Sequence, residues 1–154
     1  MRDDDPLLRE IFDRCASIAV VGIKSGATDD AHRVPHYMQQ QGHRIVPISP
    51  KLETVLGERC VASLRDLREP VDLVNLFRAP QHLPAHVDEI LAMDPLPFAA
   101  WFQLGIRHDE SAERLRKAGV RVVQDKCLMV EHARLTNRKS GTGTLLPFLP
   151  SGHS

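Results

Sequence analysis

A short loop in the first quarter of the chain carries the residues best suited to chemistry. The apolar run Ile18 to Val21 is long enough for a buried strand and too short for a helix, and the loop Gly22 to Ser25 follows it. Such a loop, placed between a strand and a helix start, offers backbone N–H groups and the positive end of the helix to an anion. Lys24 adds a positive charge. The spacing therefore predicts a phosphate-binding loop at Gly22 to Ser25.

The second predicted strand ends in residues that an NAD site would not use. Such a site combines the spacing G-x-G-x-x-G with an acidic residue about 20 positions later, which binds the ribose hydroxyls. Gly22 and Gly26 do not have that spacing, and the second strand ends at Ser49, Pro50 and Lys51. A lysine there favours a ribose that bears an additional phosphate, which indicates NADP or coenzyme A (CoA). The phosphate cradle of ATP sites, G-x-x-x-x-G-K-[ST], is absent.

Three further kinds of site have weaker signals. His82 and His86 have the i, i+4 spacing that could bind zinc, but no third ligand accompanies them, which favours an ordinary surface helix. The nucleophile elbow G-x-S-x-G of serine hydrolases is absent. Cys127 would be a nucleophile only as a thiolate, with Lys126, His132 or a helix N-terminus lowering its pKa, and a buried inert cysteine is the alternative.

The composition limits the classes of ligand and of compartment. The 154 residues fit one domain with a sizeable core, and 20 basic against 20 acidic residues give no overall charge that would attract nucleic acid or an acidic membrane. Any ligand is therefore held by a local site. The three widely spaced cysteines argue against a disulfide framework and for a reducing compartment. With no signal-type segment and no run of about 18 apolar residues, we expect a cytoplasmic protein without a transmembrane helix.

Runs of Val, Ile, Leu and Phe alternate along the chain with helical segments, which is the pattern of a parallel sheet covered on both faces. The predicted strands are 18–21, 43–49, 71–77, 98–102 and 120–124, with a weaker one at 59–61. The predicted helices are 5–16, capped by Asp5; 33–41; 81–93; 109–118; and 127–135, with a helical turn capped by Ser63. Asp29 or Asp30 could cap the second helix, but we place its start near Arg33, so that Pro35 lies in its first turn.

These elements predict an α/β fold, a single doubly wound parallel sheet, Rossmann-like, with about five principal strands flanked by helices. We expect the first strand in the middle, with the second strand on one side of it and the third principal strand on the other. The ligand site of such a fold lies at the carboxyl ends of the strands, near the point where the strand order reverses. The five strand exits, at 22–25, 49–51, 77–80, 103–105 and 125–127, should therefore converge on one cleft, the alternative for each being an ordinary surface loop.

Six segments resemble, in order and spacing, the small stand-alone CoA-binding proteins of bacteria, which are similar in turn to the nucleotide-binding domain of the succinyl-CoA synthetase alpha subunit. The segments are AVVGIKS, RVPHYMQQQGHRIVPISPK, VLGER, VDLVNLFRAP, AAWFQLGI and QDKCLMVEH. Together they cover roughly Ile11 to Leu135. The resemblance implies a CoA-binding Rossmann-like domain at residues 1–135, with residues 136–154 forming a flexible C-terminal tail.

The resemblance also implies where each part of CoA binds. The implied contacts are Gly22, Ile23, Lys24 and Ser25 at the pyrophosphate, with Arg33 nearby; Ser49, Pro50 and Lys51 at the adenosine; Phe77, Arg78 and Pro80 at the adenine or the start of the pantetheine arm; Gln103, Leu104 and Gly105 along that arm; and Cys127 and His132 toward its far end. Cys127 could then form a mixed disulfide with the CoA thiol. Members of the family usually carry Asn where Ser49 stands and Arg where Lys126 stands, so this chain departs from the pattern at these two positions.

Several of these residues also have an ordinary structural interpretation. The basic residues could be solvated surface charges, and Arg78 could pair with Asp72 or another carboxylate. Phe77 is expected to complete the core rather than to bind adenine, because aromatic residues at strand ends often do so. Trp101 is assigned to the core as well.

The resemblance implies a protein that binds CoA or acyl-CoA without catalysing a reaction alone, because CoA ligases similar to this domain place their chemistry on additional domains. Two alternatives stay open. One is an NADP-dependent oxidoreductase with His132 or Tyr37 as its proton donor, and the other is a CoA-binding subunit of a multi-chain acyl-CoA enzyme. No metal, nucleic acid or membrane is expected to bind.

Overall fold

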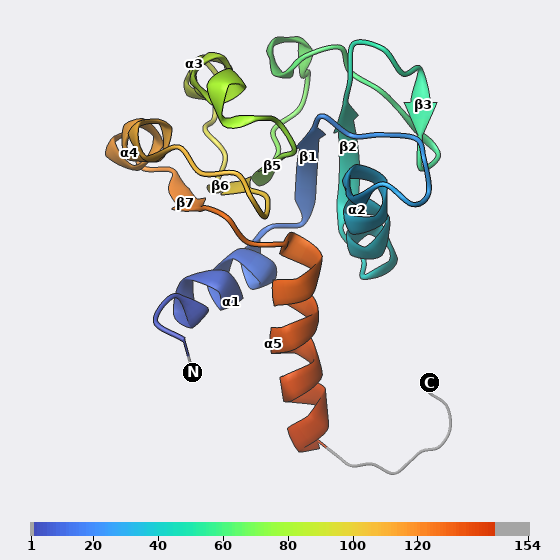
Figure 1. The fold of residues 1–154 in the computed structure, drawn as a ribbon, viewed down its shortest axis with the longest axis vertical. Helices are drawn as coiled ribbons and strands as arrows, with labels where there is room; N and C mark the ends of the chain where they lie inside the picture. Colours follow the sequence, from blue (N-terminus) through green and yellow to red (C-terminus); the bar gives the residue numbers. More distant parts are fainter. Residues whose placement is uncertain (1, 144–154) are drawn as a thin grey trace.

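Five parallel strands form the central sheet, as seen in a computed structural model that describes residues 2–143 (Figure 1). The strands are β1 (Ser17–Val21), β2 (Arg44–Ile48), β5 (Leu73–Leu76), β6 (Ala99–Phe102) and β7 (Arg121–Val123). Their order is β2-β1-β5-β6-β7, and every neighbouring pair is parallel. The doubly wound α/β fold predicted from the sequence is therefore confirmed, with the first strand between the second and third principal strands.

The remaining elements of the described chain are helices, two 3₁₀ turns and a small antiparallel strand pair. The helices are α1 (Asp5–Arg14), α2 (Asp30–Gln40), α3 (Leu83–Leu91), α4 (Asp109–Lys117) and α5 (Leu128–Gly143). The turns are η1 (Leu64–Asp66) and η2 (Pro80–His82), and the strand pair is β3 (Thr54–Val55) with β4 (Glu58–Arg59). Among residues 2–143, no helix has the length and apolar character needed to span a membrane.

The sheet buries both of its faces, and for this reason its strands are almost continuously apolar. Successive strand residues point to opposite faces. Ala19 and Val21 of β1 belong to the cluster that packs against α3 and α4. Ile18 and Val20 belong to the cluster formed with α1, α2 and α5. Figure 1 shows the two groups of helices on opposite sides of the sheet, so both faces are covered.

Helix α2 begins at Asp30 rather than near Arg33, so the predicted start is wrong. The carboxylate of Asp29 accepts the N–H of Ala31 at 2.9 Å and caps the helix at this earlier point. As a result, Pro35 lies inside the helix rather than in its first turn. A proline there removes the N–H that would bond to the carbonyl of Ala31, and the loop after β1 supplies a replacement donor, described below.

Helix α5 continues past Leu135, where the sequence predicted its end, to Gly143. The segment from 128 to 140 contains neither glycine nor proline, so nothing in it stops a helix that has already begun. Residues 136–143 of the predicted tail are therefore helical. The rest of that tail, residues 144–154, lies outside the described residues.

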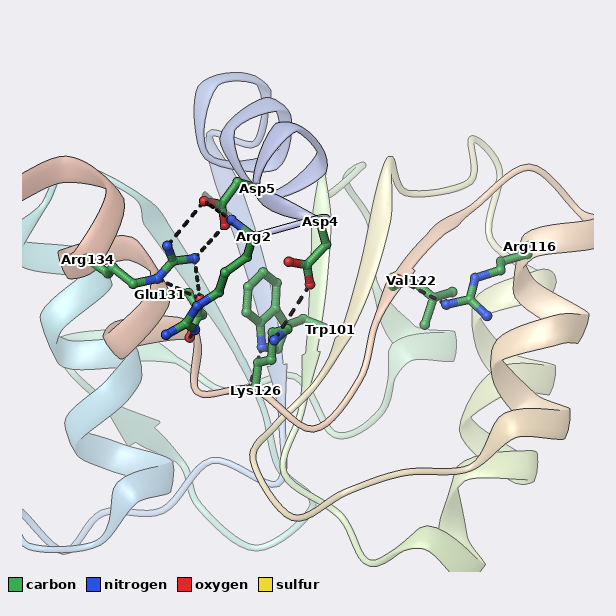
Figure 2. Close-up of polar contacts among 9 residues, drawn as sticks. All are labelled: Arg2, Asp4, Asp5, Trp101, Arg116, Val122, Lys126, Glu131 and Arg134. Atoms are coloured by element: carbon green, nitrogen blue, oxygen red, sulfur yellow. Dashed lines mark hydrogen bonds and ion pairs between the residues drawn. The ribbon is translucent and has the colours of Figure 1, made fainter. Parts of the chain in front are cut away.

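Charged side chains fasten α1 to α5 (Figure 2). Arg134 on α5 donates to the two carboxylate oxygens of Asp5 at 2.7 and 3.2 Å, and to Glu131 at 2.7 Å. Asp5 is fully buried, and the hydrogen bond from Arg134 holds the pKa of its carboxyl well below the usual range. The prediction that Asp5 caps α1 is wrong: Asp5 is the first residue of the helix, and its carboxylate is used in this contact with α5. Asp4 occupies the N-cap position without a side-chain hydrogen bond to the helix.

Candidate functional site

The candidate site lies between the carboxyl ends of β1 and β5. The chain runs from β1 to β2 on one side and then returns to β5 on the other side of β1, so the strand order reverses between these two exits. Gly22, at the β1 exit, has φ +85°, and a Cβ there would lie 2.4 Å from the carbonyl oxygen of Phe77. Any side chain at this position would therefore collide with the backbone that leaves β5. Gly22 allows the two exits to approach each other closely.

The loop after β1 is held against α2 and offers unpaired N–H groups. The N–H of Lys24 donates to the carbonyl of Ala31 at 3.2 Å. That carbonyl is free because Pro35, four residues further along the helix, has no N–H. The N–H groups of Ile23 and Ser25 donate to no acceptor within residues 2–143. Neighbouring backbone N–H groups of this kind can bind an anion.

A groove of about 420 Å³ follows the strand exits. The site residues predicted from the sequence that line it are Gly22, Lys24, Phe77, Arg78, Pro80, Gln103, Leu104, Gly105 and Cys127. The sequence analysis did not assign to the site the remaining lining residues, Asp29, Asp30, Ala31, Ala79 and Ile106. The structure thus brings together residues from the exits of β1, β5, β6 and β7, with the first turn of α2 beside them.

The exit of β2 lies outside the lining of this groove. Ser49 is buried, and its Oγ accepts the N–H groups of Lys51 at 3.2 Å and Leu52 at 3.1 Å, which turns the chain after the strand. Ser49, Pro50 and Lys51 are absent from the lining, and the side chain of Lys51 is exposed. Because β2 neighbours β1 on the side away from β5, these residues form a separate edge of the site region.

Three more predicted site residues do not line the groove. Ile23 is buried in the core beneath α2, and Ser25 is exposed. Arg33 is exposed on α2 and pairs with the carboxylate of Asp30 at 2.6 Å. Asp30 itself lines the groove, so Arg33 touches the groove only through this partner.

His132 lies in a buried aromatic cluster and not at the far end of the groove. Its Nδ1 shares a hydrogen bond of 2.9 Å with the hydroxyl of Tyr37, and the rings of Phe12 and His43 pack edge-on against it. Burial, with a smaller contribution from His43, lowers the pKa of His132. His132 and Tyr37, the two residues considered as proton donors for a reductase, are therefore hydrogen-bonded to each other where α1, α2 and α5 meet.

A buried amide pair fixes the exit of β6. The Oε1 atom of Gln103 accepts the Nδ2 of Asn75 at 3.3 Å and the N–H of Leu128, the first residue of α5, at 3.3 Å. The Nε2 atom of Gln103 donates to no acceptor among the described residues, and Gln103 lines the groove. The sequence analysis missed Asn75, although a polar residue inside the apolar run VDLVNLF was a usable signal.

The loop after β6 is tied to the exit of β7. The N–H of Gly105 donates to the Oδ1 of Asp125 at 2.7 Å. The backbone of Asp125 has φ +58°, a conformation that aspartate tolerates better than most residues. Between these anchored points, Leu104 is 66% exposed and stands at the edge of the groove as an apolar contact surface.

The structure decides several of the alternative interpretations. Arg78 does not pair with Asp72, whose carboxylate instead accepts backbone N–H groups at the start of β1. Phe77 packs on the core and also lines the groove. Trp101 is fully buried, which confirms its assignment to the core. Cys127 is half-buried and borders the groove, so it is not an enclosed core cysteine.

The histidine pair that could have bound zinc is divided between two environments. His86 contacts Arg78 and Glu89, whereas His82 is exposed. In the part of the chain that the structure describes, no three His, Cys, Asp or Glu side chains are arranged to hold a metal ion.

Another cavity, of about 300 Å³, lies between η1 and the end of α3. Its lining includes Pro70 and Asp94, which precede β5 and β6 respectively, so it opens at the amino ends of the strands. It contains none of the predicted site residues. Ligands of doubly wound sheets bind at the opposite edge, and we therefore take the groove at the carboxyl ends as the candidate site.

Comparison with known proteins gives consistent matches over most of the chain. The model of a family described as "CoA binding domain" matches residues 16–133. The protein YneT of Bacillus subtilis (strain 168) is 36% identical over 126 residues, which are 82% of this chain and 92% of YneT. The solved structure of cell-free ID.343 from Thermus thermophilus is 44% identical, with a TM-score of 0.80, and the match covers 88% of this chain and 99% of that one.

A larger enzyme contains the same fold. The dinucleotide forming acetyl-coenzyme A synthetase 1 of Ca. Korarchaeum cryptofilum, solved in complex with phosphate and ADP, is 18% identical to this chain with a TM-score of 0.63. The match covers 80% of this chain and 27% of the synthetase. At this identity the likeness concerns the fold alone.

Proposed function

This chain belongs to the family of CoA-binding domains, as its six sequence segments predicted, and on that premise we propose that it binds coenzyme A or acyl-CoA in the groove at the carboxyl ends of β1 and β5. The observation that carries the proposal is the position of Lys24 and Arg78 at the point where the strand order reverses, beside the unpaired N–H groups of the β1 loop. Two cations and free backbone donors suit a pyrophosphate.

The rest of the ligand follows from this placement. The pantetheine arm, which carries amide groups, runs from Arg78 past the side-chain amide of Gln103 and the apolar side chain of Leu104 toward Cys127. The adenosine end extends from the β1 loop toward the exit of β2, the neighbouring strand. There the exposed Lys51 binds the 3′-phosphate that distinguishes CoA from dephospho-CoA.

The protein acts as a binding module and does not transform the ligand alone. The carboxylates that line the groove are engaged: Asp29 accepts the N–H of Ala31, and Asp30 pairs with Arg33. The hydrogen bond between His132 and Tyr37 lies in the buried cluster, away from the groove lining, which argues against an NADP-dependent reductase that uses either residue as its proton donor.

Titration calorimetry with CoA, acetyl-CoA, dephospho-CoA, NADP and ATP tests the proposal. CoA and acetyl-CoA should bind more tightly than the others. Lys24→Ala should weaken CoA binding about 10- to 100-fold, because it removes a charge-assisted contact. Lys51→Ala should selectively reduce the preference for CoA over dephospho-CoA. The matched control is Lys117→Ala, which removes an exposed lysine in the last turn of α4 and should leave the affinity for each ligand unchanged. Tighter binding of NADP than of CoA would overturn the proposal.

A further inference from the structure

Three side chains, joined by hydrogen bonds, connect the groove with helix α3. The Nε–H of Arg78 donates to Nε2 of His86 at 3.3 Å, and Nδ1 of His86 lies 2.8 Å from Oε1 of Glu89. His86 and Glu89 are three residues apart on α3, so they lie on the same face of the helix. Their side chains are 18% and 17% exposed, so water has limited access to the bond between them.

The chemistry of the two neighbours fixes the form of the imidazole. The Nε of an arginine can only donate a hydrogen bond, so Nε2 of His86 must carry a lone pair. An ionised Glu89 can only accept, so Nδ1 must carry the hydrogen. His86 is therefore a neutral ring in one tautomer, which receives a hydrogen bond from Arg78 and passes one to Glu89.

This arrangement orients Arg78 without neutralising it. The two terminal nitrogens, Nη1 and Nη2, donate to no acceptor among residues 2–143, and no carboxylate pairs with the guanidinium there. Glu89 reaches Arg78 only through the uncharged ring. The Nη1–Nη2 edge thus keeps its charge and its geometry for a bidentate contact with an anion.

The surroundings of Arg78 add to this constraint. A Cβ at Gly22 would lie 3.3 Å from Cδ of Arg78, so the arginine side chain passes directly over the glycine at the β1 exit. The other acidic residue on this part of α3, Asp88, pairs with Arg114 of α4 at 2.7 Å and does not compete for Arg78. Arg78, which lines the groove, is therefore held between Gly22 on one side and His86 on the other.

We infer that His86 and Glu89 are positioning residues of the anion site, which hold the guanidinium of Arg78 in the orientation that binds a phosphate of the ligand. The inference rests on the proposed function in that CoA supplies the phosphate. It assigns to α3 a part in binding that goes beyond packing on the sheet.

A double-mutant cycle tests the inference, with titration calorimetry of both CoA and inorganic pyrophosphate. In the wild-type background, His86→Ala should weaken binding about 2- to 10-fold, as expected for the loss of one hydrogen bond that orients Arg78 but does not itself contact the ligand. His86→Gln should restore most of the affinity, because its amide can accept from Arg78 and donate to Glu89. Glu89→Ala should also weaken binding, because the imidazole is then free to present a hydrogen toward Arg78.

The decisive background is Arg78→Met, whose side chain has a similar length and no N–H that could donate to His86. In that background, His86→Ala should cause no further loss of affinity for CoA or pyrophosphate. His82→Ala, on the neighbouring η2 turn and exposed, is the matched control and should bind like the wild type. Thermal unfolding of each variant without ligand verifies that it is folded.

The outcomes separate the inference from the proposed function. If CoA binds and His86→Ala has the same effect on affinity in the wild type as in the Arg78→Met background, or no effect at all, the inference is wrong and the proposed function stands. If pyrophosphate binds with the expected coupling and CoA does not bind, the anion site is correct and the proposed function is wrong. If neither ligand binds the wild type, both are overturned.

Discussion

At the scale of single residues, the site depends as much on a missing side chain as on the charged ones. Gly22 matched a phosphate-loop pattern in the sequence, but its structural role is steric: it lets the backbone of Phe77 pass at a distance that no Cβ allows. For His132, in contrast, the structure does not support the role that the sequence indicated. It was assigned to the ligand by resemblance, and the structure places it in the buried cluster with Tyr37, Phe12 and His43.

The buried His132 predicts a dependence of stability on pH. Its pKa is lowered in the folded state, mainly by burial, so the unfolded chain binds more protons as the pH falls below about 6.5. The contribution of His132 to the free energy of unfolding should therefore be constant above neutrality and decline below this pH, by at most about 1.4 kcal/mol per pH unit for one proton. Urea unfolding of the wild type and of His132→Gln between pH 5 and 8 measures the slope.

The slope should be smaller in His132→Gln than in the wild type. His36→Gln, which alters an exposed histidine of α2, is the control and should keep the wild-type slope. The neighbouring His43 and the hydroxyls of Tyr37 and Thr136 remain in all three proteins. Equal slopes in the wild type and His132→Gln would contradict the prediction.

At the scale of elements, a proline inside helix α2 determines how the loop after β1 is held. Pro35 inside α2 leaves the carbonyl of Ala31 without its helical donor, and the N–H of Lys24 takes that place. The loop after β1 is thereby attached to the first turn of the helix. A proline usually destabilises a helix interior by about 3 kcal/mol relative to alanine, and here it contributes an anchor for the loop.

Pro35→Ala should weaken CoA binding by several-fold without lowering the melting temperature. The new N–H competes with that of Lys24 for the carbonyl of Ala31, so the loop loses its anchor while the helix gains a hydrogen bond. Calorimetry with CoA and thermal unfolding measure the two effects. Pro84→Ala, in the first turn of α3, is the control because no helix carbonyl there awaits a donor. An unchanged affinity in Pro35→Ala would disprove the role of the anchor.

At the scale of the whole molecule, the ends of the domain are joined to each other. Asp5 and Arg134, which are 129 residues apart in the sequence, form a two-bond ion pair that fastens α1 to α5 (Figure 2). Lys126, just before α5, pairs with Asp4, and its carbonyl accepts the indole N–H of Trp101. The first helix, the last helix and the central sheet therefore meet at one point.

Asp5→Asn should lower the melting temperature, because Arg134 loses a buried charged partner while Glu131 alone remains to it. The lowered pKa of Asp5 means that its contribution is fully present above about pH 4 and is lost as the pH falls further. Glu69→Gln, which breaks the exposed pair of Glu69 with Arg44, is the control and should change stability by less than about 1 kcal/mol. Thermal unfolding at pH 7 compares the melting temperatures of the two variants with that of the wild type. An equal decrease in both variants would contradict the prediction.

The sequence by itself determined the fold and much of the candidate site. Strand runs, glycines and prolines are local signals, and the preferred handedness of crossovers turned them into a sheet with the first strand between the second and third principal strands. Since the carboxyl ends of parallel strands meet at one edge, the exit residues of β1, β5, β6 and β7 could be placed together before the structure was known.

Only the tertiary structure decided the remaining features, because each depends on contacts between residues distant in the sequence. It separated His132 and the β2 exit from the groove lining, and it bound Arg78 to His86 rather than to Asp72. It also moved Asp5 from a helix cap to an ion pair with α5. The hydrogen-bond and ion-pair partners of these side chains are residues that the packing of the fold brings close to them. A local sequence pattern contains no information about such partners.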